Sequence, residues 1–200
     1  MTENIRKIAP KFKTIFTDDS PPDDPQLKDL KYWCSEFHKH SLAPLYDNGS
    51  YGNLSFRVKS GLEDFIITAS GLKLKDDLTN DSFVKVTKVD LDKMTIYASG
   101  SRAPSSESML HYAIYKQRKD VNAVFHGHSQ LILSNCERLS LPMTEKEAPY
   151  GSIVLVSGVL NILKEHNFLI IKNHGFISLG KDMEHTGSLA LEILNKYTSI

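Results

Sequence analysis

A central run of short strand candidates, preceded and followed by amphipathic helical segments, places the tightest limits on the fold. The strand candidates are rich in β-favouring residues, and glycine-bearing or charged turns separate them; they are residues 53–58, 64–68, 83–89 and 95–98. Helical periodicity precedes them over residues 26–42, where apolar residues recur at three- and four-residue steps: Leu27, Leu30, Trp33, Cys34 and Phe37. Helices interleaved with short strands predict a layered α/β domain, with helices covering both faces of a sheet.

The second half of the chain continues this alternation. The pattern predicts helices at residues 107–118, 130–136, 152–165 and 183–197, and strands at residues 121–125, 168–172 and 175–179. Ser129 is the expected N-cap of the second of these helices. Residues 1–25 are polar and proline-bearing, which predicts an extended or mobile N-terminal arm. We therefore expect one domain, spanning residues 26–200.

Composition limits the class of protein and its partners. The chain has 200 residues with 40% hydrophobic content, enough for one substantial core. It has 24 basic and 24 acidic residues, so no bulk charge attracts nucleic acid or an anionic membrane. Two cysteines are too few for a disulfide framework, and we find neither a leader pattern nor an apolar run of membrane-spanning length. We expect a cytoplasmic protein that binds neither nucleic acid nor membrane.

Three histidines and one glutamate form the strongest candidate site. His126 and His128 are two positions apart at the end of a predicted strand, so their imidazoles point to the same face. His174 precedes a glycine near the C-terminus, and Glu107 opens a helix upstream of the histidine strand. The alternative is three unrelated histidines satisfied by hydrogen bonds in the core. The neighbouring Gly127 favours a crowded common site, because it places no side chain on the opposite face.

Three neutral imidazoles and one carboxylate suit a zinc ion, although iron, manganese or cobalt would also fit. By contrast, His38 and His40 fall on a predicted helix, where their spacing turns them to different faces. His111 lies one turn after Glu107 and could orient its carboxylate, although an ordinary i,i+4 surface contact explains the spacing as well. The sequence thus predicts a divalent-metal site without fixing the metal.

Three small-residue segments offer a possible anion site. Pro104-Ser105-Ser106 before Glu107 is typical of a helix start, where a serine caps the helix and the exposed amides bind anions such as phosphate. Two turns offer similar groups, Tyr51-Gly52-Asn53-Leu54-Ser55 and Thr68-Ala69-Ser70-Gly71. Alone, each of these two is explained as an ordinary turn, since glycine, asparagine and serine are what turns prefer.

Taken together, the motifs resemble the class II aldolase/adducin family, represented by fuculose 1-phosphate aldolase and ribulose 5-phosphate 4-epimerase. The resemblance extends from Leu27 to the C-terminus and rests on five segments in the family's order. These are Gly52-Asn53-Leu54-Ser55, Ile67-Thr68-Ala69-Ser70-Gly71, Ser105-Ser106-Glu107, Ala123-Val124-Phe125-His126-Gly127-His128-Ser129 and Asn173-His174-Gly175.

This resemblance implies a three-layer α/β/α sandwich around a mostly antiparallel sheet, and a homotetramer with active sites between subunits. It implies a Zn²⁺ ion held by His126, His128 and His174, with Glu107 as the fourth metal-site residue. It also implies a pocket for the phosphate group of a sugar phosphate, formed by Gly52, Asn53, Ser70, Gly71, Ser105 and Ser106.

The implied activity is that of a zinc-dependent lyase, which cleaves a ketose 1-phosphate by retro-aldol chemistry into dihydroxyacetone phosphate and an aldehyde. Glu107 would be the catalytic proton-transfer base, with its basicity raised by partial desolvation. In the family's aldolases the residue after the serine pair is glutamate, whereas in its epimerases it looks like aspartate. Glutamate at position 107 therefore favours aldol chemistry. The alternatives are a sugar-phosphate 4-epimerase, a methylthioribulose 1-phosphate dehydratase, and a non-catalytic interaction module like the adducin head.

The family comparison also shows one departure. Fuculose aldolases carry a tyrosine in the segment after the histidine strand and another in a C-terminal tail. Here residues 141–152 hold only Tyr150, and no such tail follows the last predicted helix. The metal and phosphate half of the site therefore matches the family, whereas the aldehyde half differs.

Overall fold

The computed structural model describes residues 11–47, 49–73 and 77–198, and it contains both helices and strands throughout this part. The strands are β1 (Lys13–Asp18), β2 (Leu45–Tyr46), β3 (Gly49–Ser50), β4 (Asn53–Arg57), β5 (Phe65–Thr68), β6 (Phe83–Asp90), β7 (Thr95–Ser99), β8 (Ala123–Gly127), β9 (Phe168–Ile171) and β10 (Gly175–Gly180). The helices are α1 (Leu27–Lys39), α2 (Ser108–Gln117), α3 (Gln130–Asn135), α4 (Ile153–Leu163) and α5 (Met183–Thr198), with short 3-10 turns at η1 (Asn80–Ser82) and η2 (Cys136–Leu139).

Eight of these strands form one sheet in the order β1-β7-β6-β5-β4-β8-β10-β9. Every neighbouring pair in the sheet is antiparallel except β1 and β7, which are parallel. The two remaining strands, β2 and β3, pair only with each other and form a small ribbon. The predicted mostly antiparallel sheet is confirmed.

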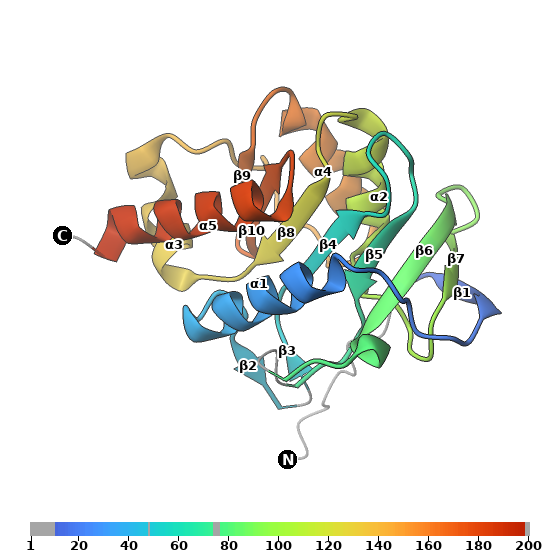
Figure 1. Ribbon diagram of the computed structural model, residues 1–200. Helices are drawn as coiled ribbons and strands as arrows, with labels where there is room; N and C mark the ends of the chain where they lie inside the picture. The colour runs from blue at the N-terminus through green and yellow to red at the C-terminus, as the bar shows by residue number, and fades with distance from the viewer. Residues whose placement is uncertain (1–10, 48, 74–76, 199–200) are drawn as a thin grey trace, which may run out of the picture.

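Helices cover both faces of the sheet, so the predicted three layers are confirmed as well. In Figure 1, α1 and α5 lie side by side in front of the sheet, and α2 and α4 lie behind it. Side chains alternate between the two layers along β8: Val124 packs with α2 and α4, whereas Ala123 and Phe125 pack with α1, α3 and α5. The residue after Phe125 therefore faces α2.

The N-terminal segment differs from its prediction. Residues 1–25 were expected to form an arm outside the domain, but Lys13–Asp18 forms an edge strand of the sheet. Phe12 is 9% exposed and packs into the core, and the Lys13 amide donates to the Met94 carbonyl at 2.8 Å. A short parallel edge strand between polar residues leaves little periodicity, so its partner strand, far along the chain, could not be read from the sequence. Residues 1–10 lie outside the described part.

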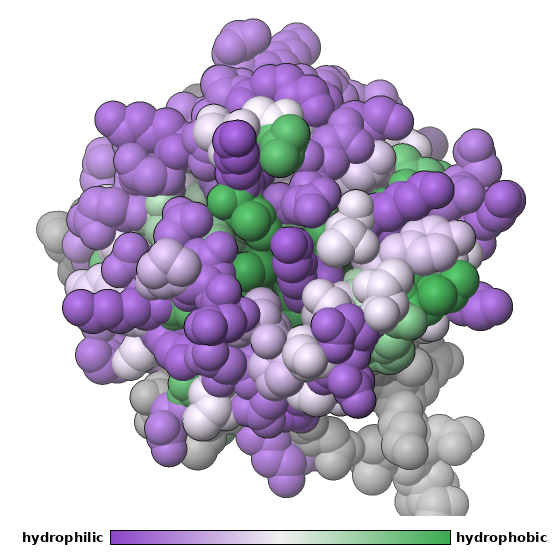
Figure 2. Space-filling model, turned by 45° about the vertical axis from the view of Figure 1, so that its right-hand side comes forward, coloured by the Kyte–Doolittle hydropathy of each residue, from purple (hydrophilic) through white to green (hydrophobic). Residues whose placement is uncertain are grey.

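The other predicted elements agree with the structure to within a few residues. Ser129 caps α3 as predicted, because its hydroxyl accepts from the Ile132 amide at 3.4 Å. Within the described residues, no helix has both the length and the apolar character needed to cross a membrane. The face drawn in Figure 2 is mostly hydrophilic, with a few hydrophobic residues exposed near its middle.

Candidate metal centre

β8 places His126 on the face of the sheet that α2 covers. Its side chain is fully buried, and its Nδ1 lies 2.8 Å from the Phe176 carbonyl oxygen. Because a carbonyl can only accept a hydrogen bond, Nδ1 carries a proton, which leaves Nε2 as the nitrogen that would bind a metal. A metal-binding histidine commonly has its other nitrogen held in this way.

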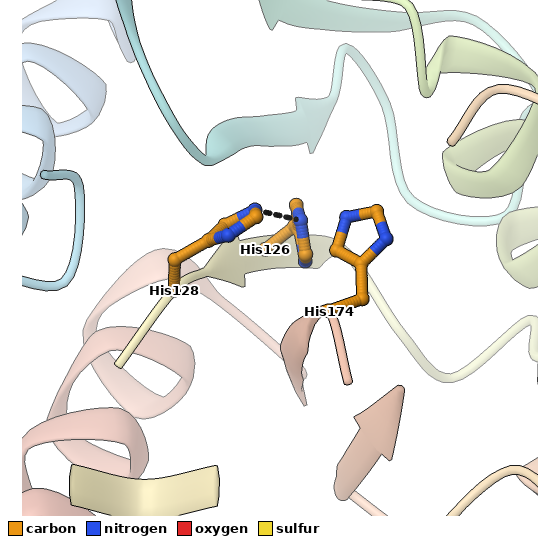
Figure 3. Close-up of side chains that lie close together, drawn as sticks. All are labelled: His126, His128 and His174. Atoms are coloured by element: carbon orange, nitrogen blue, oxygen red, sulfur yellow. Dashed lines mark hydrogen bonds between the residues drawn. The ribbon is translucent and has the colours of Figure 1, made fainter. Parts of the chain in front are cut away.

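The rings of His128 and His174 both lie beside the ring of His126. The Nε2 atoms of His126 and His128 are 2.9 Å apart, and one ligand atom from each of the three histidines lies within 4.8 Å of the others. Figure 3 shows the three rings gathered around a common point, with His126 and His128 at the end of β8 and His174 between β9 and β10. The three histidines therefore form a candidate metal site rather than three separate core contacts.

Glu107 faces this group from the start of α2. Its side chain is 4% exposed; Oε2 lies 3.1 Å from His126 Nε2, and Oε1 lies 3.3 Å from His174 Nε2. Asn53 is the cross-strand partner of His126, so both side chains lie on one face, and its amide donates to Oε2 at 3.0 Å.

The donors present fit a divalent metal. Zn–N bonds of about 2.0–2.1 Å hold two nitrogen ligands up to about 4 Å apart, so small ring rotations would bring all three imidazoles onto one ion. Glu107 Oε1 is buried beside His174 Nε2, so it is placed to contact the same ion. Three imidazoles and a carboxylate suit zinc and other first-row divalent cations.

The electrostatics of Glu107 correct one expectation. Burial raises its pKa, but the His126 charge, the His174 hydrogen bond and charge, and the Asn53 hydrogen bond together hold the pKa well below the usual value. The carboxyl group is therefore ionised, and its basicity is lowered rather than raised. Glu107 in turn shifts the pKa of His174. Burial lowers the pKa of His174, but the hydrogen bond and charge of the Glu107 carboxylate outweigh burial, so the pKa is raised.

His111 has a different partner from the one expected. It is fully buried, and its Nδ1 lies 2.7 Å from the Ser55 hydroxyl, which also lies 2.8 Å from the Tyr115 hydroxyl. Its Nε2 has no hydrogen-bond partner, so His111 does not orient Glu107 by a direct hydrogen bond. Burial lowers the pKa of His111 to about 3, so the ring is neutral. His111 contacts Ser55 because β4 places the Ser55 side chain on the face of the sheet that α2 covers.

Two glycines allow the histidine strand and its neighbour to approach closely. A Cβ on Gly127 would lie 2.4 Å from the Phe176 ring. A Cβ on Gly175 would lie 2.4 Å from the Gly127 carbonyl oxygen and 2.9 Å from His126 Cε1. All three distances are too short for real atoms, so the site requires glycine at each of the two positions.

Gly175→Ala will therefore displace His126 and lower the free energy of unfolding by about 1–3 kcal/mol, as overpacking does. Chemical denaturation and metal content of the purified variant measure the two effects. Gly158→Ala in helix α4 is the matched control, because the new Cβ would lie 3.9 Å from Thr144 Cγ2, an ordinary contact. Equal stability of Gly175→Ala and the wild type would contradict the crowding argument.

A cavity of about 350 Å³ opens beside the three histidines. Its lining includes every residue that the resemblance placed in the phosphate pocket: Gly52, Asn53, Ser70, Gly71, Ser105 and Ser106. Glu107, His128 and His174 line the same cavity. Of the predicted site residues, His126 alone stays behind this surface, as a fully buried side chain. The predicted residues therefore meet in one place.

Several polar groups at the serine end already have partners. The Ser70 amide donates to the Ala103 carbonyl at 2.9 Å, and the Ser105 amide donates to the Thr68 carbonyl at 3.2 Å. The predicted serine cap also differs: α2 begins after Glu107 without a side-chain cap, and the Ser105 hydroxyl accepts from the Glu107 amide at 3.4 Å. An anion at this end would depend on the hydroxyl groups and the remaining amides.

Three tyrosines that line the cavity were not assigned to the site from the sequence: Tyr46, Tyr51 and Tyr150. The Tyr51 ring stacks on His128, with centroids 4.7 Å apart, and Tyr46 packs against Tyr51 at 4.8 Å. Tyr51 stands directly before the Gly52-Asn53 motif, which was the available signal. Tyr46 comes from the β2–β3 ribbon, which no periodicity predicted.

Comparison with known proteins decides the family. The Class II Aldolase and Adducin N-terminal domain matches residues 29–195. The chain belongs to this family. Among the relatives, it is 32% identical to the L-fuculose phosphate aldolase of Methanocaldococcus jannaschii over 159 residues, which covers 70% of this chain and 80% of the relative. It is 29% identical to the methylthioribulose-1-phosphate dehydratase of Leptospira borgpetersenii, covering 78% and 74% of the two chains.

Solved structures show the same fold. An L-fuculose 1-phosphate aldolase superposes with a TM-score of 0.71 at 19% sequence identity, covering 89% of this chain and 85% of that one. The chain is thus a class II aldolase-family enzyme with a candidate metal site at His126, His128 and His174. Its relatives in the family include both an aldolase and a dehydratase.

Proposed function

We propose that this protein is a divalent-metal-dependent lyase, with zinc as the expected metal, that cleaves a ketose 1-phosphate into dihydroxyacetone phosphate and an aldehyde. The position of Glu107 carries the proposal. Its buried carboxylate lies between the His126 and His174 nitrogens and also lines the cavity, where a substrate carbon can reach it. A base confined to the core or a ligand facing away from the cavity could not perform this chemistry.

The reaction requires one proton to leave and one to be added. The C3–C4 bond of the ketose breaks, the C4 hydroxyl loses its proton as the aldehyde forms, and C3 gains a proton to complete dihydroxyacetone phosphate. When bound, the divalent cation would supply Lewis-acid stabilisation of negative charge on the substrate oxygens. Glu107 is ionised at rest, so it is proposed to take up a proton from solvent and add it at C3, and in the reverse direction to remove that proton from C3 and return it to solvent.

The neighbouring residues fix how Glu107 and the substrate meet. The Asn53 amide holds Oε2, which leaves Oε1 beside His174. At the other end of the cavity, the hydroxyls of Ser70, Ser105 and Ser106 and the turns at Gly52 and Gly71 are proposed to bind the phosphate group. The substrate would then lie with its phosphate on these turns and its C3 carbon beside Glu107.

A dehydratase acting on a methylthioribulose 1-phosphate is the second candidate. It is favoured by the dehydratase relative, which is 29% identical over 192 residues, nearly as similar as the aldolase relative. An epimerase would use the same groups, but no observation favours it over these two. The non-catalytic module is disfavoured, because three histidines and a carboxylate converge at one buried point.

We extend the proposal to a homotetramer with active sites between subunits. Exposed apolar side chains on α4 support an interface, since Ile153 is 40% exposed and Val154 is 65% exposed, close in the chain to the cavity-lining Tyr150. Light scattering of the full-length protein in solution tests this. A monomer would contradict the assembly while leaving the chemistry of one subunit open to assay.

Product analysis separates the candidate reactions. The metal-loaded protein is incubated with a panel of ketose 1-phosphates, including methylthioribulose 1-phosphate, and products are identified by mass. A lyase releases dihydroxyacetone phosphate, a dehydratase yields a product lighter by one water, and an epimerase preserves mass. We expect dihydroxyacetone phosphate from at least one substrate. Dehydration across the panel, with no triose phosphate formed, would replace the proposed lyase with the second candidate.

A further inference from the structure

At the serine end, where the proposed substrate would carry its phosphate, the described residues that line the cavity are uncharged. A phosphate monoester bears a charge of about −1.5 to −2 at neutral pH. Among the described residues that line the cavity there is no lysine or arginine, and two amides at the serine end are already paired. Neutral hydroxyls and amides can donate hydrogen bonds to the phosphate but do not neutralise its charge, whereas a lysine ammonium does both. A cation close to the serine end would complete the site.

Lys11 supplies a cation at the edge of this cavity. Its Nζ lies 4.6 Å from the centroid of the Tyr150 ring, and Tyr150 lines the cavity. The next residue, Gly151, has φ +62 and approaches Ser106 so closely that a Cβ would lie 2.7 Å from the Ser106 carbonyl oxygen. The Tyr150 segment therefore borders the serine end, and the Lys11 ammonium lies over the ring of this segment.

The chain around Lys11 is held in place. Phe12 packs into the core that includes α2, and the Lys13 amide hydrogen bonds to the Met94 carbonyl at 2.8 Å. Phe12 is buried, whereas Lys11 beside it is exposed. The flexible four-carbon stem of a lysine then allows Nζ to leave the Tyr150 face for a nearby oxygen anion.

We propose that Lys11 binds the phosphate group of the substrate, with Tyr150 as the aromatic surface that holds its ammonium at the mouth of the cavity. This assignment rests on the proposed function, because it takes the cavity to be the substrate site. It gives the N-terminal segment a role that its anchoring to the sheet by itself does not explain. Lys11 acts in binding and does not touch the carbon atoms that react.

Titration calorimetry with inorganic phosphate tests the assignment on the full-length, metal-loaded protein. Lys11→Ala should weaken phosphate binding by about fivefold, the upper range for an exposed charge pair. Lys11→Arg should bind nearly as well as the wild type. Lys13→Ala is the matched control, since it removes the same charge at another exposed position two residues away. In proton exchange on dihydroxyacetone phosphate, Lys11→Ala should raise KM and leave kcat unchanged, as expected for lost uniform binding.

The outcomes separate this inference from the proposed function. Three results would overturn the role of Lys11. Phosphate binding could be unchanged in Lys11→Ala, it could be weakened equally in Lys13→Ala, or the wild type could fail to bind phosphate. If the protein exchanges protons but its phosphate affinity does not depend on Lys11, the proposed lyase activity stands and only the role of Lys11 is rejected. If phosphate binding depends on Lys11 but no proton exchange occurs, the phosphate site stands and the proposed lyase activity is rejected.

Discussion

His174→Ala and His126→Ala proteins will lose the bound divalent metal. Three imidazole nitrogens within 4.8 Å of one another form the donor set, and removing one leaves too few ligands at a common point. The affinity should fall by more than about 100-fold, the upper end of the loss seen when even an outer partner of a ligand is removed. Elemental analysis after dialysis against a weak chelator measures the metal retained per chain.

The two variants differ in their effect on stability. His126 is fully buried and hydrogen bonds to the Phe176 carbonyl, so its truncation also leaves a cavity and an unpaired acceptor. The His174 side chain is 14% exposed, which makes His174→Ala the cleaner variant. His166→Ala is the control, because His166 is exposed and lies outside the cluster. A folded His174→Ala protein that retains one metal per chain would contradict the three-histidine site.

Glu107→Gln will retain much of the metal but lose proton exchange at C3 of dihydroxyacetone phosphate. Glutamine has nearly the same shape, its side-chain oxygen can still accept from Asn53, and the three histidines remain. It cannot take up a proton at neutral pH, so the exchange rate should fall by about 10²–10⁴, the usual contribution of a general base. Proton NMR in heavy water follows the exchange directly.

The control for this variant is Glu192→Gln on α5. Glu192 is exposed and pairs with Lys196 at 2.8 Å, so its change removes a carboxylate without touching the cavity. It should exchange at the wild-type rate. If Glu107→Gln holds the metal and also exchanges at the wild-type rate, Glu107 is not the proton-transfer group, and a cavity tyrosine would become the next residue to test.

Local sequence predicted the centre of the site well. His126 and His128 are two positions apart at the end of a strand, so the alternation of side chains along a strand places both on the same face. Glycine beside His126 and after His174 indicated a close approach, which the contacts around Gly127 and Gly175 explain. Because these signals depend on neighbouring residues in the chain, the sequence carried them.

Contacts between distant segments could not be predicted in the same way. Asn53 meets Glu107, and Ser55 meets His111, because α2 packs against β4, which is more than 50 residues away in the chain. The parallel pairing of Lys13–Asp18 with β7 brings together residues about 80 positions apart in the chain. Such partners are set by the sheet order, which short periodic patterns do not specify.

Proton exchange by the wild-type protein tests the central claim most directly. Dihydroxyacetone phosphate is incubated in heavy water with the metal-loaded protein, and proton NMR follows the two hydrogens at C3. One carboxylate held on one side of the substrate should replace one of these hydrogens with deuterium, and a chelator that removes the metal should stop the reaction. Protein that holds one metal per chain but exchanges neither hydrogen, or exchange that continues after the metal is removed, would contradict a metal-dependent lyase with Glu107 as its base.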